Sequence, residues 1–254
     1  LVEALTAAHA AAVAALLGPN GIGREAVDVI GFHGHTISHR PWEGSTIQIG
    51  DGALLARLTG IDVVNDFRTA DVRSGGQGAP LVPVFHAALA RGLEHPLAVL
   101  NIGGVANVTW IGAALDPAIA APAEGALLAF DTGPGNALLD DWVLKRTGAH
   151  WDADGKLALA GRADAGAAAA ILANPYFERR PPKSLDRDHF DASPVSRLSP
   201  ADGAATLVDV TARSAALARR FFPAPAKRWL VCGGGRRNPA IMRALEAAIA
   251  EQVD

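Results

Sequence analysis

The stretch that decides the fold runs from Leu127 to Trp142 and reads LLAFDTGPGNALLDDW. Its apolar first part predicts a strand that ends at Asp131. A turn of glycine, proline and asparagine follows, and an apolar pattern with helical spacing begins at Ala137. A strand that brings a carboxylate to a helix start is typical of an active-site edge, because the carboxylate can take a proton and free backbone N–H groups can hold phosphate. The alternative interpretation is a tight turn in which Asp131 caps the helix.

Two further glycine-rich turns lie in similar surroundings. Residues 97–112 read LAVLNIGGVANVTWIG, which predicts two strands joined by a turn at Gly103 and Gly104. Residues 228–245 read RWLVCGGGRRNPAIMRAL, which predicts a buried strand, a glycine turn and a helix with Pro239 near its start. Glycine allows positive φ and lets a ligand approach the backbone. Each motif alone is a weak signal, but together they predict two phosphate or nucleotide cradles in one α/β chain.

The remaining pattern alternates between strands and helices. Strands are predicted at residues 27–32, 46–49 and 61–65, and helices at residues 1–17, 52–59, 81–93, 136–147, 163–173 and 201–222. Such alternation indicates a mainly parallel sheet with helices on its faces. We place a domain boundary at the sequence Glu-His-Pro, residues 94–96, so that residues 1–95 form a first lobe and residues 96–254 a second.

Composition excludes several classes of function. The formal net charge of −3 leaves no basic excess to neutralise a phosphate backbone, so a nucleic-acid partner is not expected. No apolar run approaches the length of a membrane span, and a soluble cytoplasmic protein is expected. Cys232 is the single cysteine, which excludes an internal disulfide, and its apolar surroundings predict a buried structural thiol. His33, His35 and His39 fit no standard zinc spacing, and no metal site is predicted.

Six strings together resemble one known family. They are GFHGHTISHRP, STIQIGDGALLARLTGIDVVNDFRTADVRSGGQGAPLVPVFH, LNIGGVANVT, FDTGPGNALLDDW, PPKSLDRDHFD and VCGGGRRNP. In this order, between about Val29 and Met242, they are similar to the anhydro-N-acetylmuramic acid kinases of the actin/hexokinase/Hsp70 ATPase superfamily. The resemblance implies an α/β actin-like ATPase (ribonuclease H-like) fold with two lobes and an interlobe cleft.

The same resemblance implies a reaction. Such a kinase opens the 1,6-anhydro ring of anhydro-N-acetylmuramic acid with water and phosphorylates O6 from ATP with Mg²⁺. The product is N-acetylmuramate 6-phosphate, formed in murein recycling in the cytoplasm. The expected partners are therefore the small sugar substrate and ATP, and a homodimer is a further hypothesis. The alternatives are another actin-fold sugar kinase or phosphatase, or a nucleotide-binding pseudo-kinase or regulator on the same fold.

The chain also departs from the family pattern. Those kinases begin with a Ser-Gly-Thr-Ser-x-Asp-Gly hairpin, and they continue with further strand and helix beyond the adenosine turn. This chain begins at Leu1, inside an expected helix, and its last residue is Asp254. We therefore expect an internal fragment with an incomplete first lobe and a second lobe incomplete at its C-terminal end. His35 stands where the family usually has glutamine.

Two aspartates compete for the role of general base. Asp66 stands beside Arg68, and a carboxylate paired with an arginine is a poorer base. This favours Asp131 as the catalytic base, in agreement with the resemblance, and leaves Asp66 and Arg68 as a sugar-positioning or structural pair. The candidate substrate-binding residues are His33, Thr36, Asp66, Arg68 and Gln77. The resemblance implies nucleotide binding by Asn101, Gly103, Gly104, Asn107, Gly133, Gly135, Asn136, Gly233, Gly234, Gly235 and Asn238.

Other polar and aromatic residues receive structural interpretations. Lys183 and Arg187 are expected to form a mobile basic pair that reaches the ligand when the lobes close. Asp140 and Asp141 are expected on a solvated helix face. The tryptophans are interpreted as packing residues, namely Trp42, Trp110, Trp142, Trp151 and Trp229.

Overall fold

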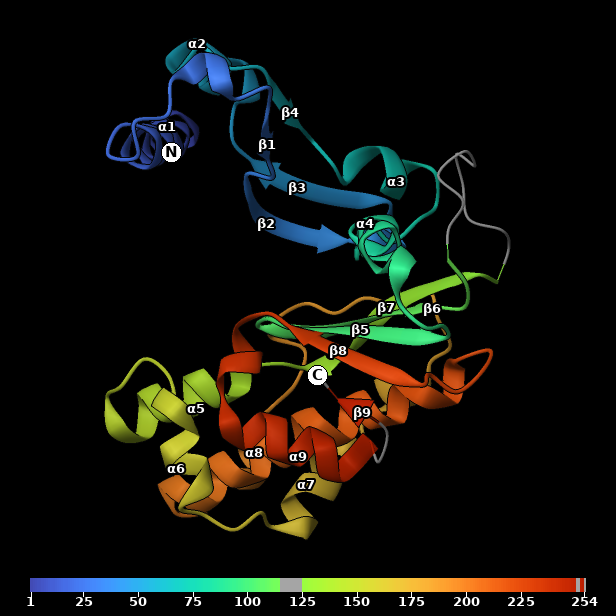
Figure 1. The fold of residues 1–254 in the computed structure, drawn as a ribbon. Helices are drawn as coiled ribbons and strands as arrows, with labels where there is room; N and C mark the ends of the chain where they lie inside the picture. Colours follow the sequence, from blue (N-terminus) through green and yellow to red (C-terminus); the bar gives the residue numbers. More distant parts are fainter. Residues whose placement is uncertain (115–124, 250–251, 254) are drawn as a thin grey trace. The chain divides into compact units, whose positions relative to one another are not determined.

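A computed structural model describes residues 1–114, 125–249 and 252–253 of the chain (Figure 1). The chain divides into two compact units, Leu1–Leu81 and Val82–Asp254. The two are described separately here. No helix in the described part of the chain has the length and apolar character needed to cross a membrane.

The first unit contains two small sheets and three helices. β1 (Ile30–Phe32) pairs in parallel with β4 (Val63–Asn65), and β2 (His35–Arg40) pairs antiparallel with β3 (Ser45–Ile49). Its helices are α1 (Val2–Leu17), α2 (Gly52–Thr59) and α3 (Thr69–Arg73). The predictions for α1, α2 and β3 are confirmed, whereas β2 and α3 were not predicted, because β2 consists mainly of polar residues without an apolar alternation.

Side-chain caps explain where α2 begins. Asp51 lies at the N-cap, and its Oδ1 accepts a hydrogen bond of 2.8 Å from the Leu54 backbone N–H. The Asp51 backbone N–H in turn donates to the Thr6 hydroxyl, 3.1 Å away on α1, and Thr6 is fully buried. These bonds join α1 to the start of α2.

The second unit is built on one five-stranded sheet. Its strands are β5 (Leu97–Ile102), β6 (Val105–Ile111), β7 (Leu127–Pro134), β8 (Arg228–Cys232) and β9 (Gln252–Val253). Their spatial order is β7-β6-β5-β8-β9. The first three form an antiparallel meander, while β8 and β9 run parallel to β5. The prediction of a mainly parallel sheet is wrong for this unit, because the tight glycine turn can only join antiparallel strands.

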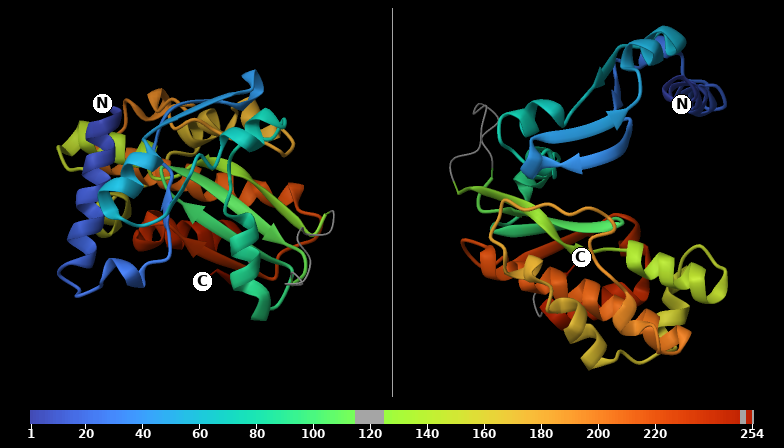
Figure 2. Two further views of the ribbon diagram at one scale, coloured as in Figure 1. Left: turned by 90° about the horizontal axis from the view of Figure 1, so that it is seen from above. Right: turned by 180° about the vertical axis from the view of Figure 1, so that it is seen from behind.

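Within the described residues, six helices lie around this sheet, and residues that alternate along the strands pack into two different apolar clusters, one on each face. The helices are α4 (Pro83–Leu89), α5 (Ala137–Thr147), α6 (Lys156–Leu159), α7 (Ala165–Leu172), α8 (Pro200–Leu217) and α9 (Pro239–Ile249). The main core contains Leu100, Phe130 and Trp229 on one face of the sheet, and α8 and α9 cover it (Figures 1 and 2). A smaller cluster on the other face packs Ala87 of α4 on the sheet.

The helix α4 explains why the observed division of the chain differs from the expected boundary at residues 94–96. Ala87 is fully buried against strands of the second unit. His86 lies 2.9 Å, from Nδ1 to Oγ1, from Thr109 of β6. Because α4 packs on this sheet, the division falls between Leu81 and Val82, ahead of the helix.

The tryptophans follow the packing prediction only in part. Trp110, Trp142 and Trp229 are buried, as predicted. Trp42 and Trp151 are 66% and 63% exposed, so the prediction is wrong for these two. Short local sequence does not decide burial for a large side chain that lies outside a periodic segment.

Candidate functional site

A row of polar side chains crosses the sheet of the second unit. In the strand register, Cys232 of β8 lies opposite Asn101 of β5, Asn101 opposite Asn107 of β6, and Asn107 opposite Asp131 of β7. Residues that face each other across neighbouring strands point to the same side of the sheet. The fold therefore brings together candidate residues from two separate sequence motifs, with Cys232 of a third motif beside them. Burial raises the pKa of the Cys232 thiol, in keeping with a structural rather than a nucleophilic cysteine.

Asp131 lies beside an irregularity in β7. The register between β6 and β7 shifts at this point, so that Thr132 is an extra residue between the pairs formed by Asp131 and Gly133. Such bulges bend a strand and change the direction of a neighbouring side chain. Asp131 is 6% exposed, and its Oδ2 accepts a hydrogen bond of 2.7 Å from the backbone N–H of Leu185. The helix-cap interpretation of Asp131 is wrong, since Asn136 occupies the N-cap of α5.

The turn after Asp131 closes on the β5–β6 hairpin through backbone hydrogen bonds. The N–H groups of Gly135 and Ala137 donate to the Gly104 carbonyl at 2.9 and 3.1 Å. The Asn136 N–H donates to the Gly103 carbonyl at 2.7 Å. These three N–H groups are therefore already used by the hairpin, which corrects the expectation that the start of this helix offers them to phosphate.

The glycines of the hairpin leave enough room for a Cβ atom at ordinary contact distance. A Cβ atom on Gly103 would come no closer than 3.5 Å to another atom, and one on Gly104 no closer than 3.7 Å. Gly234, in the turn after β8, is similar at 3.6 Å. None of the three has positive φ, so the fold does not use the left-handed conformation that glycine allows at these positions. Because the fold does not need glycine here, these positions leave backbone open to a close ligand.

The other glycines of these motifs are needed by the fold itself. A Cβ atom on Gly135 would lie 2.2 Å from the Gly103 carbonyl oxygen, and one on Gly235 would lie 2.4 Å from the Ile102 side chain. On Gly133 it would meet the Ser214 side chain at 2.7 Å. Gly233 has φ +82°, a conformation that other residues adopt only with strain. These four candidate nucleotide-binding residues are explained by close packing and backbone shape.

A pocket of about 400 Å³ joins two of the motifs in the second unit. Its lining consists of Asn136, Asp140, Trp151, Asp152, Ala153, Asp154, Gly234, Arg237 and Asn238. The amide of Asn136 donates to the Ile102 carbonyl at 3.1 Å, and the Oδ1 of Asn238 accepts from the Ala240 N–H at 3.0 Å. Both side chains therefore fix the two turns that form the wall of the pocket. Of the candidate nucleotide-binding residues, the pocket brings together Asn136, Gly234 and Asn238.

Sequence reasoning missed the acidic and aromatic part of this pocket. Asp140 is half-buried, and burial, followed by the nearby charges of Asp141 and Asp152, raises the pKa of its carboxyl group. The interpretation of Asp140 as a solvated helix residue is therefore wrong. The signal was present, because Asp140 lies four residues after Asn136 and so on the same face of α5. Asp141 is exposed and forms an ion pair of 2.7 Å with Arg187.

Lys183 differs most from its prediction. Its side chain is not mobile at the surface, because the residue is only 2% exposed. The ammonium nitrogen donates to the Tyr176 carbonyl at 3.2 Å. Burial, followed by the nearby charges of Arg220 and Arg179, lowers the pKa of Lys183 to about 8.

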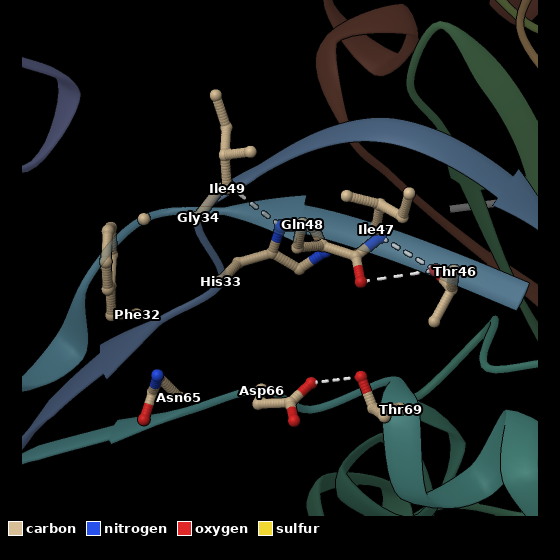
Figure 3. Close-up of a pocket in the computed structure, with 11 residues that line it drawn as sticks. Phe32, His33, Gly34, Thr46, Ile47, Gln48, Ile49, Asn65, Asp66 and Thr69 are labelled. Carbon is tan, nitrogen blue, oxygen red and sulfur yellow. Dashed lines mark hydrogen bonds between the residues drawn. The ribbon is translucent and has the colours of Figure 1, made fainter. Parts of the chain in front are cut away.

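The first unit contains a second pocket, of about 310 Å³ (Figure 3). It is lined by Phe32, His33, Gly34, Thr46, Ile47, Gln48, Ile49, Gly50, Asn65, Asp66 and Thr69. Figure 3 shows Thr46 and Gln48 of β3 on one side of it, with Asn65, Asp66 and Thr69 on the other.

The candidate sugar-binding residues relate to this pocket in different ways. His33 and Asp66 line it, and the Nε of Arg68 donates to the Nε2 of His33 at 3.0 Å. Asp66 has φ +57°, and its Oδ1 accepts a hydrogen bond from the Thr69 hydroxyl. Thr36 is joined to the lining through Gln48, whose Nε2 donates to its hydroxyl at 3.3 Å.

Gln77 is the candidate sugar-binding residue whose connection to this pocket stays a prediction. It is half-buried and does not line the pocket within the described part of the chain. Its neighbour Gly78 accepts a hydrogen bond of 2.9 Å from Arg68. Gln48 was missed, because β2 and β3 were not recognised as a hairpin. The described residues contain no group of three histidine, cysteine or carboxylate side chains arranged to hold a metal ion.

Comparison with known proteins identifies the family. The family model described as anhydro-N-acetylmuramic acid kinase matches residues 1–254. The chain belongs to the anhydro-N-acetylmuramic acid kinase family. It is 57% identical to the anhydro-N-acetylmuramic acid kinase of Rhodospirillum rubrum, over 254 residues that are 100% of this chain and 64% of that protein. With that of Paramagnetospirillum magneticum it shares 57% identity over 249 residues, 97% of this chain and 67% of the relative.

The chain thus spans about two thirds of the length of these curated relatives. Two solved structures are also similar. The xylulose kinase from Rhodospirillum rubrum has 18% identity and a TM-score of 0.45, and the match covers 79% of this chain and 41% of that chain. The dehydratase activator from Clostridium difficile has 15% identity and a TM-score of 0.41, and the match covers 82% of this chain and 77% of that chain.

The fold of this family member is mixed α/β, and the actin-like ATPase fold that the resemblance implies stays a prediction. Its second unit has the antiparallel meander β5-β6-β7 extended by the parallel strands β8 and β9. The glycine turns of the family strings lie between β5 and β6, after β7 and after β8. The interlobe cleft and the two-lobe division at residues 94–96 stay predictions.

Proposed function

We propose that this chain carries the nucleotide site and the catalytic base of an ATP-dependent kinase that acts on anhydro-N-acetylmuramic acid. The reaction opens the 1,6-anhydro ring with water, phosphorylates O6, and gives N-acetylmuramate 6-phosphate for murein recycling in the cytoplasm. Family membership supports the substrate and the reaction type. The single observation that carries the proposal is the polar row of β8, β5, β6 and β7, which ends at Asp131 beside the open hairpin.

Asp131 is proposed as the general base. Water attacks C1 of the sugar and gives a proton to the Asp131 carboxylate, while the C1–O6 bond breaks. O6 then bonds to the γ-phosphorus of ATP as the bond from that phosphorus to the bridging oxygen breaks, and ADP leaves. The backbone N–H of Leu185 holds the Oδ2 of Asp131 at 2.7 Å, which fixes its direction before the reaction. Removing a positioned base of this kind typically costs about 10²–10⁴ in rate.

The nucleotide is proposed to bind across the two turns of the second unit. The pocket of about 400 Å³ would take the adenosine part, with Gly234, Asn136 and Asn238 in its wall. Gly103 and Gly104 would lie against the phosphates, because without side chains they let phosphate oxygens approach the backbone. When bound, ATP supplies the transferred phosphoryl group. Positioning and charge stabilisation provide most of the catalysis in such transfers.

Mg²⁺ is proposed to enter with the phosphates of ATP. The described residues hold no cluster of three metal-ligating side chains, and Mg²⁺ is commonly bound through substrate phosphates with few protein ligands. The sugar is proposed to contact His33, Thr36, Asp66 and Arg68 of the first unit. Their support is the pocket that His33 and Asp66 line and the hydrogen bond from Arg68 to His33.

The test measures ADP release by the full-length protein with anhydro-N-acetylmuramic acid as the sugar. The product should have the mass of the substrate plus one water and one phosphoryl group. Xylulose serves as a control sugar without an anhydro ring. ADP release with xylulose but not with the anhydro sugar would contradict the substrate assignment, and failure of both nucleotide binding and ADP release would contradict the kinase assignment.

A further inference from the structure

Three hydrogen bonds link Asp131 to one segment, residues 176–185, and a fourth lies within the segment. The Tyr176 hydroxyl donates to the Asp131 carbonyl at 2.6 Å, and the Asp131 N–H donates to the Lys183 carbonyl at 3.2 Å. The Leu185 N–H donates to the Asp131 carboxylate at 2.7 Å. The ammonium of Lys183 then donates to the Tyr176 carbonyl at 3.2 Å, which closes the circuit. The segment thus covers the edge strand β7 at the position of the candidate base.

The ammonium of Lys183 lies among aromatic rings. Its nitrogen is 4.5 Å from the ring centre of Tyr176, 4.6 Å from that of Phe221 and 5.4 Å from that of Phe130. A cation at such distances is attracted by the face of each ring. Phe130 directly precedes Asp131 on β7, so the cage and the carboxylate are built on adjacent residues.

Stability alone does not explain a lysine at this position. Burial lowers its pKa to about 8, which means that the fold disfavours the charged ammonium relative to water. The Tyr176 carbonyl also accepts from the Arg179 N–H at 3.1 Å, so it would keep a partner without the lysine. An apolar side chain of similar length would therefore fill this cage at no loss of stability. The charges that act on the ammonium are those of Arg220, Arg179, Glu178 and Asp131.

We propose that Lys183 is a positioning residue for Asp131. Lys183 holds the segment that orients the Asp131 carboxylate, and it keeps a positive charge near that carboxylate. This inference rests on the proposed function, in which Asp131 is the base. The attraction between the two groups is mutual: it favours the ammonium of Lys183 and equally favours the carboxylate anion of Asp131, the form that can accept a proton. Tyr176 connects the two groups, because its carbonyl accepts from the Lys183 ammonium and its hydroxyl donates to the Asp131 carbonyl.

The experiment uses Lys183→Met in the full-length protein, because methionine keeps the length of the stem and removes the charge. Lys145→Met is the matched control, since Lys145 is exposed on α5. For Lys183→Met we expect an unchanged or higher unfolding midpoint at pH 7. Its kcat should fall by between about tenfold and 100-fold, as for a displaced catalytic group, with KM for both substrates nearly constant. The acid limb of its kcat/KM profile should move to higher pH.

A second variant keeps the proposal testable if Lys183→Met does not fold. Tyr176→Phe retains the ring and the lysine but removes the hydrogen bond to the Asp131 carbonyl, and it should also lower kcat at nearly constant KM. A wild-type kcat in both variants overturns the proposal. The proposal is also overturned if the activity of Lys183→Met falls only in proportion to the loss of folded protein while the acid limb of its kcat/KM profile stays at the wild-type pH.

Asp131→Asn in the same assays separates this inference from the proposed function. Near-normal turnover in Asp131→Asn would refute the base assignment itself, whatever Lys183→Met does. An inactive Asp131→Asn together with a wild-type pH profile and kcat in Lys183→Met would refute the role of Lys183 alone.

Discussion

The fold needs Gly135 but not Gly104, so the same substitution should have opposite effects at the two positions. At Gly135→Ala the new Cβ atom would lie 2.2 Å from the Gly103 carbonyl oxygen, well inside the 3.4 Å where ordinary contact begins. Both groups are backbone, so the turn after β7 must move away from the hairpin. Its movement weakens the three hydrogen bonds that Gly135, Asn136 and Ala137 donate to the hairpin.

The size of the effect follows from these contacts. Overpacking a close-packed site costs about 1–3 kcal/mol. Each weakened hydrogen bond adds about 0.5–1.5 kcal/mol. Because the movement does not break all three bonds completely, we expect Gly135→Ala to lower the free energy of unfolding by about 2–5 kcal/mol.

Gly104→Ala is the matched control for folding and the test of the ligand site. Its Cβ atom would come no closer than 3.7 Å to Ala137, and Gly104 does not have positive φ. The substitution should raise the free energy of unfolding by about 0.4–1 kcal/mol, because it restricts the unfolded chain. It should nevertheless weaken ATP binding, by about tenfold or more, because the methyl group occupies the space proposed for phosphate oxygens.

Urea unfolding followed by circular dichroism measures the first quantity, and calorimetry with ATP and with the sugar measures the second. Wild-type stability of Gly135→Ala would refute the closure of the turn on the hairpin. Wild-type ATP affinity of Gly104→Ala would refute the hairpin as a phosphate cradle, and equal losses for ATP and sugar would indicate a general structural defect.

Three further predictions concern charged residues. Asp131→Asn should keep the fold and lower turnover by on the order of 10³-fold or more, as measured by ADP release; near-normal turnover would contradict its role as base. Lys183 has its pKa lowered to about 8 from 10.5, so the unfolded chain binds more protons between these values. The free energy of unfolding should therefore rise with pH by on the order of 3 kcal/mol across this window in wild type, and no such difference should remain in Lys183→Met. Because burial and neighbouring carboxylates raise the pKa of Asp140, the fold disfavours its ionised form, and Asp140→Asn should be more stable than wild type at neutral pH yet bind ATP less tightly. An unchanged ATP affinity in calorimetry would remove Asp140 from the nucleotide site.

Local patterns in the sequence predicted most of the elements that carry the site. The alternating and apolar runs predicted β5, β6, β7 and β8, and the glycine motifs predicted the turn between β5 and β6 and the turns after β7 and β8. Asp131 was predicted to end a strand because an apolar run leads directly into it, whereas β7 continues to Pro134. These features depend on neighbours within a few residues, so a single sequence carries them.

The tertiary structure decided how the site is built from these elements. Strand register, which joins segments far apart in the chain, put Asn101, Asn107 and Asp131 in one row. The antiparallel meander and the use of the helix-start N–H groups by the hairpin both depend on that pairing, and the sequence reasoning missed them.

The sequence by itself therefore determined which residue types stand at strand ends and turns, since backbone conformation there is set locally. Only the tertiary structure decided their surroundings. Lys183 was expected at the surface because lysine is usually exposed, but Tyr176 of its own segment and the distant Phe130 and Phe221 enclose it. The burial of a side chain and the electrostatic environment at its position depend on all residues that surround it in space, and the chain brings most of these together only when it folds.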